Sequence, residues 1–228
     1  MYKTLPELVK DKRGVRDIIA ASLEAQMDAD PRVCYLDADL MNCIGTRKLA
    51  AKYPRRAVNC GIAESNMIGV AAGMSAAGMI PYAHTFGIFA SRRVMDQAFL
   101  SVAYAKLNVR VLGSDPGVTA ALNGGTHMPF EDMAPYLAIP KAVAIEVCDC
   151  AQAASIMDQV KDMYGLIYIR IMRKNPVAVY PEGTKFTVGK GALLREGSDV
   201  TLMASGIMVA ESLKAAYAGC RGHLRARD

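Results

Sequence analysis

The stretch from Glu64 to His84 reads ESNMIGVAAGMSAAGMIPYAH, and its pattern decides the fold. Residues 64–77 place small and apolar side chains at helical spacing, and Gly78 ends the predicted helix. Residues 79–84 form a short apolar run, which is typical of a strand covered on both faces. A buried helix that leads directly into a buried strand predicts one unit of a layered α/β fold.

The same region carries no charged side chain from Ser65 to Ser91, so its length alone would allow it to cross a bilayer. Its composition argues against a membrane span, because Ala, Gly and Ser dominate and Pro81 and His84 lie in the middle. We therefore expect a buried helix and strand, and no membrane partner.

Alternating strand and helix patterns extend outward from this unit. On its amino-terminal side the pattern predicts helices over 16–27 and 46–53 and strands over 32–36 and 57–59. On its carboxyl side it predicts helices over 91–105 and 151–163, strands over 109–113, 142–147 and 166–171, and a Gly-rich loop over 114–129. This order predicts a doubly wound α/β domain with a mostly parallel sheet over residues 1–173.

A second unit is expected after a polar, Pro- and Gly-rich linker over 174–186. Residues 187–228 predict the start of a second α/β domain, with strands over 190–194 and 199–204 and a helix over 209–217. The remaining tail is basic and lacks an apolar period, so we expect this second domain to be partial and the chain to be truncated in it.

Composition limits the classes of function. The chain has 228 residues, 52% of them hydrophobic and 21% charged, with a net charge of +5. Its Lys and Arg residues are scattered rather than interleaved with aromatic residues, which disfavours nucleic acid as a partner. Six Cys occur without a CxxC pair, and the charged amino terminus lacks a signal core, so we expect no metal site and a cytoplasmic location.

Polar and aromatic side chains follow the predicted strands, where open α/β sheets bind ligands. They are Asp39, Glu64, Phe86 and Phe89, the loop 123–127, and Arg173. Taken singly, each has a structural explanation: an acid caps a helix, a Phe fills a core, and a loop His is solvated. Their shared location favours a ligand site, although the chain contains no GxGxxG, P-loop or nucleophile-elbow motif for a nucleotide phosphate or an acyl transfer.

Four blocks of sequence resemble the transketolase family in their order and spacing. They are NCGIAESNMIGVAAGMSAAG (59–78), PYAHTFGIFASRRVMDQ (81–97), NGGTHMPFEDMAPYLAIP (123–140) and YIRIMRKNP (168–176). The upstream GVRDIIAASLEA and YLDADL are also similar to family elements. The resemblance spans roughly residues 14–212, and it implies a pyrimidine-type, thiamine-diphosphate-binding domain and the C-terminal section of a split transketolase.

The resemblance implies roles for individual residues near the cofactor. Glu64 would hydrogen-bond the pyrimidine ring in an apolar pocket that favours its neutral form, and so activate the cofactor for catalysis. Phe86 and Phe89 would wall the ring, and Asp39 and Ile62 would also contact the cofactor.

The substrate residues follow from the same resemblance. His127 and Asn123 would contact the sugar, with His127 also catalytic. Arg16 and Arg173 would hold the sugar phosphate, because a guanidinium fork suits that anion. Asn123 replaces the Asp of many transketolases and Leu137 replaces an Arg, which leaves the exact sugar open.

In this family the diphosphate and Mg²⁺ are held by a GDG-containing region, and this sequence has no GDG. We therefore expect an N-terminal partner subunit that carries it, self-association across the active-site interface, a heterotetramer, and activity in the pentose phosphate pathway only with the partner. Two alternatives stay open: a deoxyxylulose-phosphate synthase or 2-oxoacid dehydrogenase β-type subunit, and a truncated, non-catalytic binding chain.

Overall fold

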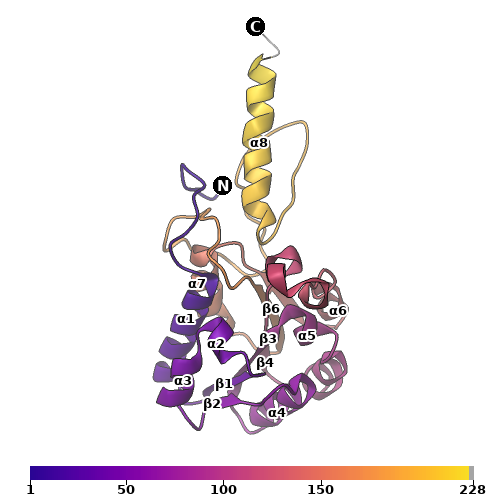
Figure 1. The fold of residues 1–228 in the computed structure, drawn as a ribbon. Helices are drawn as coiled ribbons and strands as arrows, with labels where there is room; N and C mark the ends of the chain where they lie inside the picture. The colour runs from indigo at the N-terminus through magenta and orange to yellow at the C-terminus, as the bar shows by residue number, and fades with distance from the viewer. Residues whose placement is uncertain (226–228) are drawn as a thin grey trace.

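A single parallel sheet forms the centre of the protein, as seen in a computed structural model that describes residues 1–225 (Figure 1). Its strands, in chain order, are β1 (Val33–Asp37), β2 (Ala57–Asn59), β3 (Ile80–Phe86), β4 (Val109–Ser114), β5 (Val143–Glu146) and β6 (Leu166–Ile171). Their order across the sheet is β2-β1-β3-β4-β6-β5, and every pairing is parallel. The expected doubly wound, mostly parallel sheet is confirmed.

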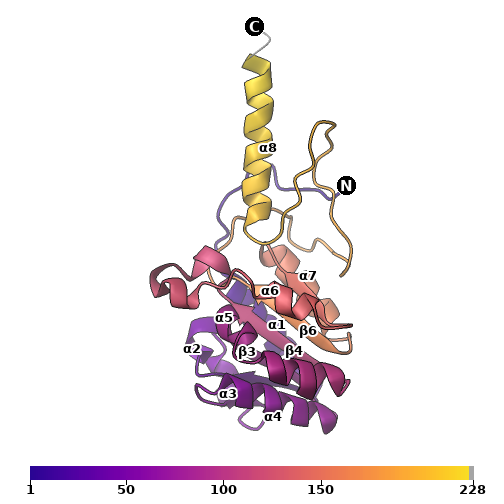
Figure 2. The same ribbon diagram turned by 90° about the vertical axis from the view of Figure 1, so that its right-hand side faces the viewer.

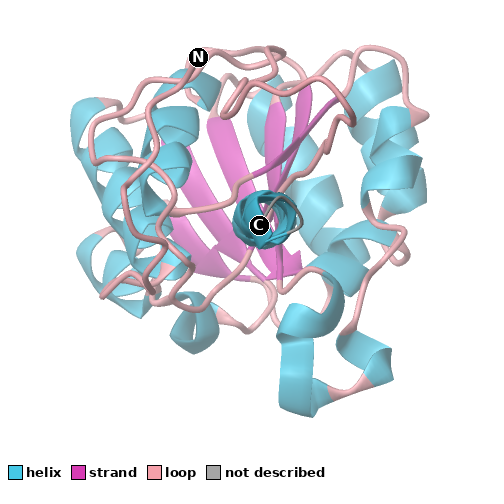
Figure 3. Ribbon diagram, turned by 90° about the horizontal axis from the view of Figure 1, so that it is seen from above, coloured by secondary structure: helices cyan, strands magenta, loops and turns pink. Residues whose placement is uncertain are grey.

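Helices cover both faces of this sheet (Figure 3). On one face the core contains α1 (Val15–Ala29), α2 (Met41–Ile44), α3 (Arg47–Lys52) and α7 (Cys150–Val160). On the other it contains α4 (Glu64–Ala76), α5 (Gly87–Ser91), the π-helix η1 (Gln97–Tyr104) and α6 (Met133–Leu137). Successive residues of β1 serve the two cores in turn, Tyr35 on the α1 side and Leu36 on the α4 side, because strand side chains alternate.

The α4–β3 unit forms as its sequence predicts. The buried residues of α4 are Glu64, Met67, Ile68, Ala71 and Ala72, which recur at helical spacing on one face. In β3 every residue after Ile80 is buried. No helix in the described part of the chain is long and apolar enough to cross a membrane.

The predicted single helix over 91–105 is wrong in its start and its type, although residues 95–104 are helical. The chain instead leaves α5 at Ser91, turns through residues 92–94, and enters the π-helix η1. The predicted loop over 114–129 contains two short 3₁₀ helices, η2 (Gly117–Asn123) and η3 (Gly125–His127). Apolar periodicity does not detect a turn that keeps Val94 and Ala98 buried on the same side.

The two strands predicted over 190–194 and 199–204 are also wrong, because no strand is formed between residues 187 and 207. Short strands need partners in a sheet, and the described chain supplies none there. The helix predicted over 209–217 lies within a longer one, α8 (Met208–Arg225), which projects away from the domain (Figures 1 and 2).

A third, smaller core joins the two ends of the chain at the base of α8. It contains Val179, Tyr180, Phe186 and Leu213, with Tyr2 packed against them. The Tyr2 and Phe186 rings stack with centroids 5.1 Å apart, and the Tyr2 amide donates to the carbonyl of Leu193. The division into a domain over 1–173, a linker and a second domain stays a prediction.

Candidate functional site

The carboxyl ends of the parallel strands meet at one edge of the sheet, which we call the carboxyl edge. The chain passes from β1 to β2 on one side of β1, and then crosses back to β3 on the other side, so the direction of the connections reverses at β1. Such a reversal opens a crevice between neighbouring strands where ligands bind in open α/β sheets. The predicted site residues Asp39 and Phe86 follow or end these two strands.

Glu64 is the first residue of α4, and only 5% of it is exposed. Arg93 Nη1 donates to Glu64 Oε1 at 3.0 Å. The pocket expected around Glu64 was apolar, so a positive charge in contact with the carboxyl is a feature that the sequence analysis missed. The signal for it was weak, because Arg92 and Arg93 together look like an ordinary surface pair.

An aromatic cluster lies at the end of β3 and includes three predicted residues. The His127 ring stands edge-on to Phe86 and Phe89, with centroid distances of 5.5 and 5.3 Å. The two Phe rings are 6.3 Å apart and tilted by 56°. These residues come from β3, α5 and η3, so the structure brings together side chains that are far apart in the sequence.

Arg173 completes this cluster from the segment after β6. Its guanidinium lies 5.0 Å from the centre of the Phe86 ring, and its Nη2 is 2.5 Å from Asp115 Oδ2. Burial of Arg173 opposes its charge, but the hydrogen bond and charge of Asp115 outweigh this and raise the pKa of Arg173 above its ordinary value. Asp115 is itself almost fully buried and adopts a left-handed backbone conformation (φ 63°), which is strained for a residue with a side chain.

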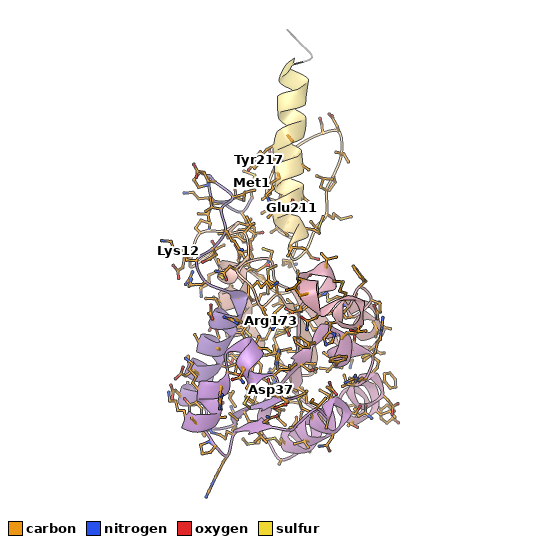
Figure 4. The ribbon with its side chains drawn as sticks, viewed as in Figure 1. Met1, Lys12, Asp37, Arg173, Glu211 and Tyr217 are labelled. Atoms are coloured by element: carbon orange, nitrogen blue, oxygen red, sulfur yellow. The ribbon has the colours of Figure 1, made fainter. Side chains whose placement is uncertain are left out.

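Two further predicted substrate residues, Arg16 and Asn123, make no hydrogen bond to this group within the described residues. Arg16, at the start of α1, donates to the carbonyl of Cys43 at 3.4 Å. Asn123 is exposed at the end of η2, two residues after Ala121, whose backbone is also left-handed (φ 48°). Figure 4 labels Arg173 below the base of α8.

Among the residues that the structure describes, Asp39, which follows β1, makes its side-chain contacts with Asn59 and not with the aromatic rings. Asn59 donates to Asp39 Oδ1 at 2.8 Å and accepts from the Asp39 amide at 3.0 Å. These two residues line a hollow of about 240 Å³ together with Met41, Asn42 and Arg47. Ile62 is 76% exposed. Within residues 1–225, Asp39 and Ile62 have no hydrogen bond to Glu64 or His127.

A buried chain of hydrogen bonds crosses three strands beneath this edge, and the sequence analysis missed it. His84 Nδ1 lies 2.8 Å from Asp37 Oδ2, and His84 Nε2 lies 3.1 Å from Ser114 Oγ. Tyr35 donates to Asp37 Oδ2 at 2.6 Å and accepts from Thr46 at 3.1 Å. Burial, with the nearby charge of Asp37, raises the pKa of Tyr35 well above its usual value, so the phenol remains a donor.

Comparison with known proteins adds family evidence. Residues 11–179 match the model of the transketolase pyrimidine-binding domain. The 6-deoxy-6-sulfo-D-fructose transketolase subunit SqwH of Clostridium sp. (strain MSTE9) is 48% identical over 210 residues, which are 92% of this chain and 65% of that protein. Transketolase-like protein 1 of Macaca fascicularis is 30% identical over 211 residues, 91% of this chain and 35% of that protein. The chain thus spans less than two thirds of the length of these relatives.

A solved structure of a split-gene transketolase, an inactive beta4 tetramer, superposes with a TM-score of 0.81 at 34% identity. The superposition covers 95% of this chain and 69% of that one. The similarity therefore includes the segment after residue 179 as well as the sheet.

Proposed function

Because this chain belongs to the transketolase family and carries its pyrimidine-binding domain, we propose that it is the C-terminal subunit of a split transketolase. In this proposal it contributes one half of a thiamine-diphosphate site and works only with a partner chain. The observation that carries the proposal is the convergence of Phe86, Phe89 and His127 at the carboxyl edge, with Glu64 joined to Phe89 through Arg93.

The residues of this edge fit the aminopyrimidine ring of the cofactor. Glu64 offers a nearly buried carboxyl that can exchange a proton with a ring nitrogen, and Phe86 and Phe89 offer apolar walls. Asp39 and Ile62 lie toward the exposed side, where a second chain and the rest of the cofactor have access. When bound, thiamine diphosphate supplies the electron sink for breaking a carbon–carbon bond beside a carbonyl.

The diphosphate and Mg²⁺ are assigned to an N-terminal subunit with the GDG motif, which is absent from this sequence. Support comes from the relatives, since one is called a subunit and another a split-gene product. We further propose self-association across the same edge, two copies of each subunit in a heterotetramer, and a cytoplasmic location.

The substrate we propose is a ketose with a terminal anion. His127 and Asn123 would contact its hydroxyl and carbonyl groups, with His127 also positioned to exchange protons, while Arg16 and Arg173 would bind the anion. Sugar phosphates of the pentose phosphate pathway are one class that fits this description.

A sulfonated ketose is the second class, and one contact favours it. Asp115 already neutralises Arg173 at 2.5 Å, so it repels a phosphate, which carries nearly two negative charges, more than a sulfonate, which carries one. The relative that is 48% identical is named for 6-deoxy-6-sulfo-D-fructose.

The test is a ketol-transfer assay of this chain alone, its partner alone, and the two together, with thiamine diphosphate and Mg²⁺. Xylulose 5-phosphate and 6-deoxy-6-sulfofructose would be compared as donors, with a pyruvate decarboxylation assay for the alternative enzyme classes. We expect activity only in the mixture, and loss of at least a hundredfold with Glu64→Gln, since that change removes a positioned proton-transfer group.

Glu24→Gln is the matched control, because Glu24 also pairs with cations but lies on α1, away from the carboxyl edge. Activity of this chain alone, or full activity of the Glu64→Gln mixture, would contradict the proposal. Folded subunits that associate but transfer no ketol group from either donor would favour the non-catalytic alternative.

A further inference from the structure

Arg93 makes two contacts at once within the ring site proposed above. Its Nη1 donates to Glu64 Oε1 at 3.0 Å. The carbon of the same guanidinium lies 3.9 Å from the centre of the Phe89 ring. One side chain therefore covers both the carboxyl and an aromatic wall to which the cofactor ring is assigned.

A guanidinium resembles an aminopyrimidine in the properties that these contacts use. Both are planar and stack on an aromatic face, and a pyrimidine nitrogen that has taken a proton from Glu64 donates an N–H in the ring plane, as the guanidinium does. We infer that Arg93 occupies the place of the cofactor ring in this chain, and that the ring binds there by displacing it. The inference rests on the proposed function, since it concerns the same Glu64 and Phe89.

The anchoring of Arg93 allows its side chain to leave while its backbone stays. Ser65 donates to the carbonyl of Arg93 at 2.5 Å, which ties the turn over 92–94 to the start of α4. The Arg93 side chain is 49% exposed, whereas that of Glu64 is 6% exposed. The arginine thus approaches from solvent and can return there, while Glu64 remains fixed beneath it.

The contacts of Arg93 with Glu64 and Phe89 are weak enough for the cofactor ring to displace the arginine. An ion pair and a cation–π contact that are made by a half-exposed arginine each change an equilibrium only several-fold. Together they compete with a ligand by about tenfold, which slows or weakens binding without blocking it.

If Arg93 instead supported the bound cofactor, removing it would change the cofactor affinity in the opposite direction. If Arg93 stayed beside Glu64 in the bound state and held its carboxyl in position, removing Arg93 would weaken cofactor binding. If Arg93 is displaced, removing it strengthens binding, because the site no longer has an internal competitor.

The experiment is a calorimetric titration of thiamine diphosphate, with Mg²⁺ present, into the complex of this chain and its partner. The variants are Arg93→Ala, which removes the guanidinium, and Arg93→Met, which keeps an unbranched apolar side chain. Arg92→Ala is the control, because Arg92 is the neighbouring exposed arginine and pairs with Glu131. Urea unfolding of each variant verifies that the subunit is folded.

We expect the dissociation constant to fall about tenfold for Arg93→Ala and Arg93→Met and to stay unchanged for Arg92→Ala. Equal or weaker binding by both Arg93 variants would overturn the inference, and the proposed function would stand as long as Glu64→Gln still weakens binding. If Glu64→Gln also had no effect on binding, the assignment of the ring to Glu64 would fail, and the proposed function with it.

Discussion

Two arginines at opposite edges of the sheet make different use of the same side chain. Arg110, in β4, is fully buried, and its guanidinium donates to the carbonyls of Val160 and Lys161, at 3.0 and 3.2 Å, and to that of Met163. Arg173, beyond the end of β6, faces the Asp115 carboxylate and the Phe86 ring. One arginine is bound by backbone at the end of α7, and the other by side chains at a site.

The electrostatics of the two edges differ in the same way. Burial lowers the pKa of Arg110, whereas Asp115 raises that of Arg173 despite its partial burial. Backbone carbonyls cannot move away from Arg110, but a carboxylate can be exchanged for another anion. The edge with exchangeable partners is therefore the one suited to bind ligands.

Cavity size does not indicate which edge of the sheet carries the candidate site. The larger of the two hollows described, about 620 Å³, lies at the amino edge, where its lining includes Gln26, Asn108 and Lys161. None of the predicted site residues lines it. Converging, exchangeable charges therefore identify the candidate site better than empty volume does.

Removing Arg110 should give the largest effect on stability. Arg110→Leu leaves three carbonyls at the end of α7 without a donor, and we expect the free energy of unfolding to fall by about 3 kcal/mol. Urea unfolding measures this loss. Arg32→Ala, which removes an exposed arginine at the same edge, should change stability by less than about 0.5 kcal/mol. Equal losses in the two variants would show that the three carbonyl contacts of Arg110 add no stability beyond that of an exposed ion pair.

Tyr35→Phe tests the buried hydrogen-bond chain beneath the carboxyl edge. The change removes the donor to Asp37 and leaves the ring in place, so we expect a loss of about 1.5 kcal/mol in the free energy of unfolding. Ketol-transfer activity of the folded mixture should stay within about threefold, since Tyr35 does not reach the site surface. A large loss of activity at unchanged stability would extend the site inward to this chain.

Asp115→Asn should affect substrate choice more than stability. Asn retains a hydrogen-bond acceptor and tolerates the left-handed backbone, but it leaves Arg173 without its counter-charge, so we expect the free energy of unfolding to fall by about 1 kcal/mol. Losing the negative charge should lower KM for the sugar phosphate about fivefold relative to the sulfonated sugar. An unchanged KM ratio would show that Asp115 does not act on the terminal anion.

Glu24 provides the smallest effect, which is a change in the acid dependence of stability. Hydrogen bonds from Lys48 and Lys52 lower the pKa of Glu24 in the folded state. A lowered pKa contributes stability above the unfolded-state pKa, and this contribution is lost as the pH falls through the folded-state pKa. The urea midpoint of Glu24→Gln should therefore approach that of the wild type below about pH 4, and 0.5 M salt should reduce the difference at pH 7.

Strong local patterns explain which parts of the fold were predictable. Residues 57–59 and 166–171 were predicted with the strand bounds that the structure shows, since the apolar run of β6 lies between clear breaks. The region over 91–105 was not, because a turn followed by a π-helix retains the apolar spacing of one α-helix. The strands predicted over 190–204 failed because a strand depends on a partner that no local pattern encodes.

Site residues were predictable only where they lie in the sequence blocks that resemble the transketolase family. Resemblance to the family identified Glu64, Phe86, Phe89 and His127, and the structure places the three aromatic rings in contact. Arg93 and Asp115 were missed, because their partners are determined by folding and not by spacing. Their contacts join segments that lie 29 and 58 residues apart.

The small core at the base of α8 also has a consequence for the order in which the protein is made. Tyr2 precedes the sheet in the sequence, but Phe186, on which it stacks, emerges only after the whole sheet has been synthesised. The segment that contains Tyr2 therefore lacks its contacts with this core while residues 15–171 fold. Joined last and by few side chains, the two segments that meet in this core should also be the first part of the described chain to exchange its amide hydrogens.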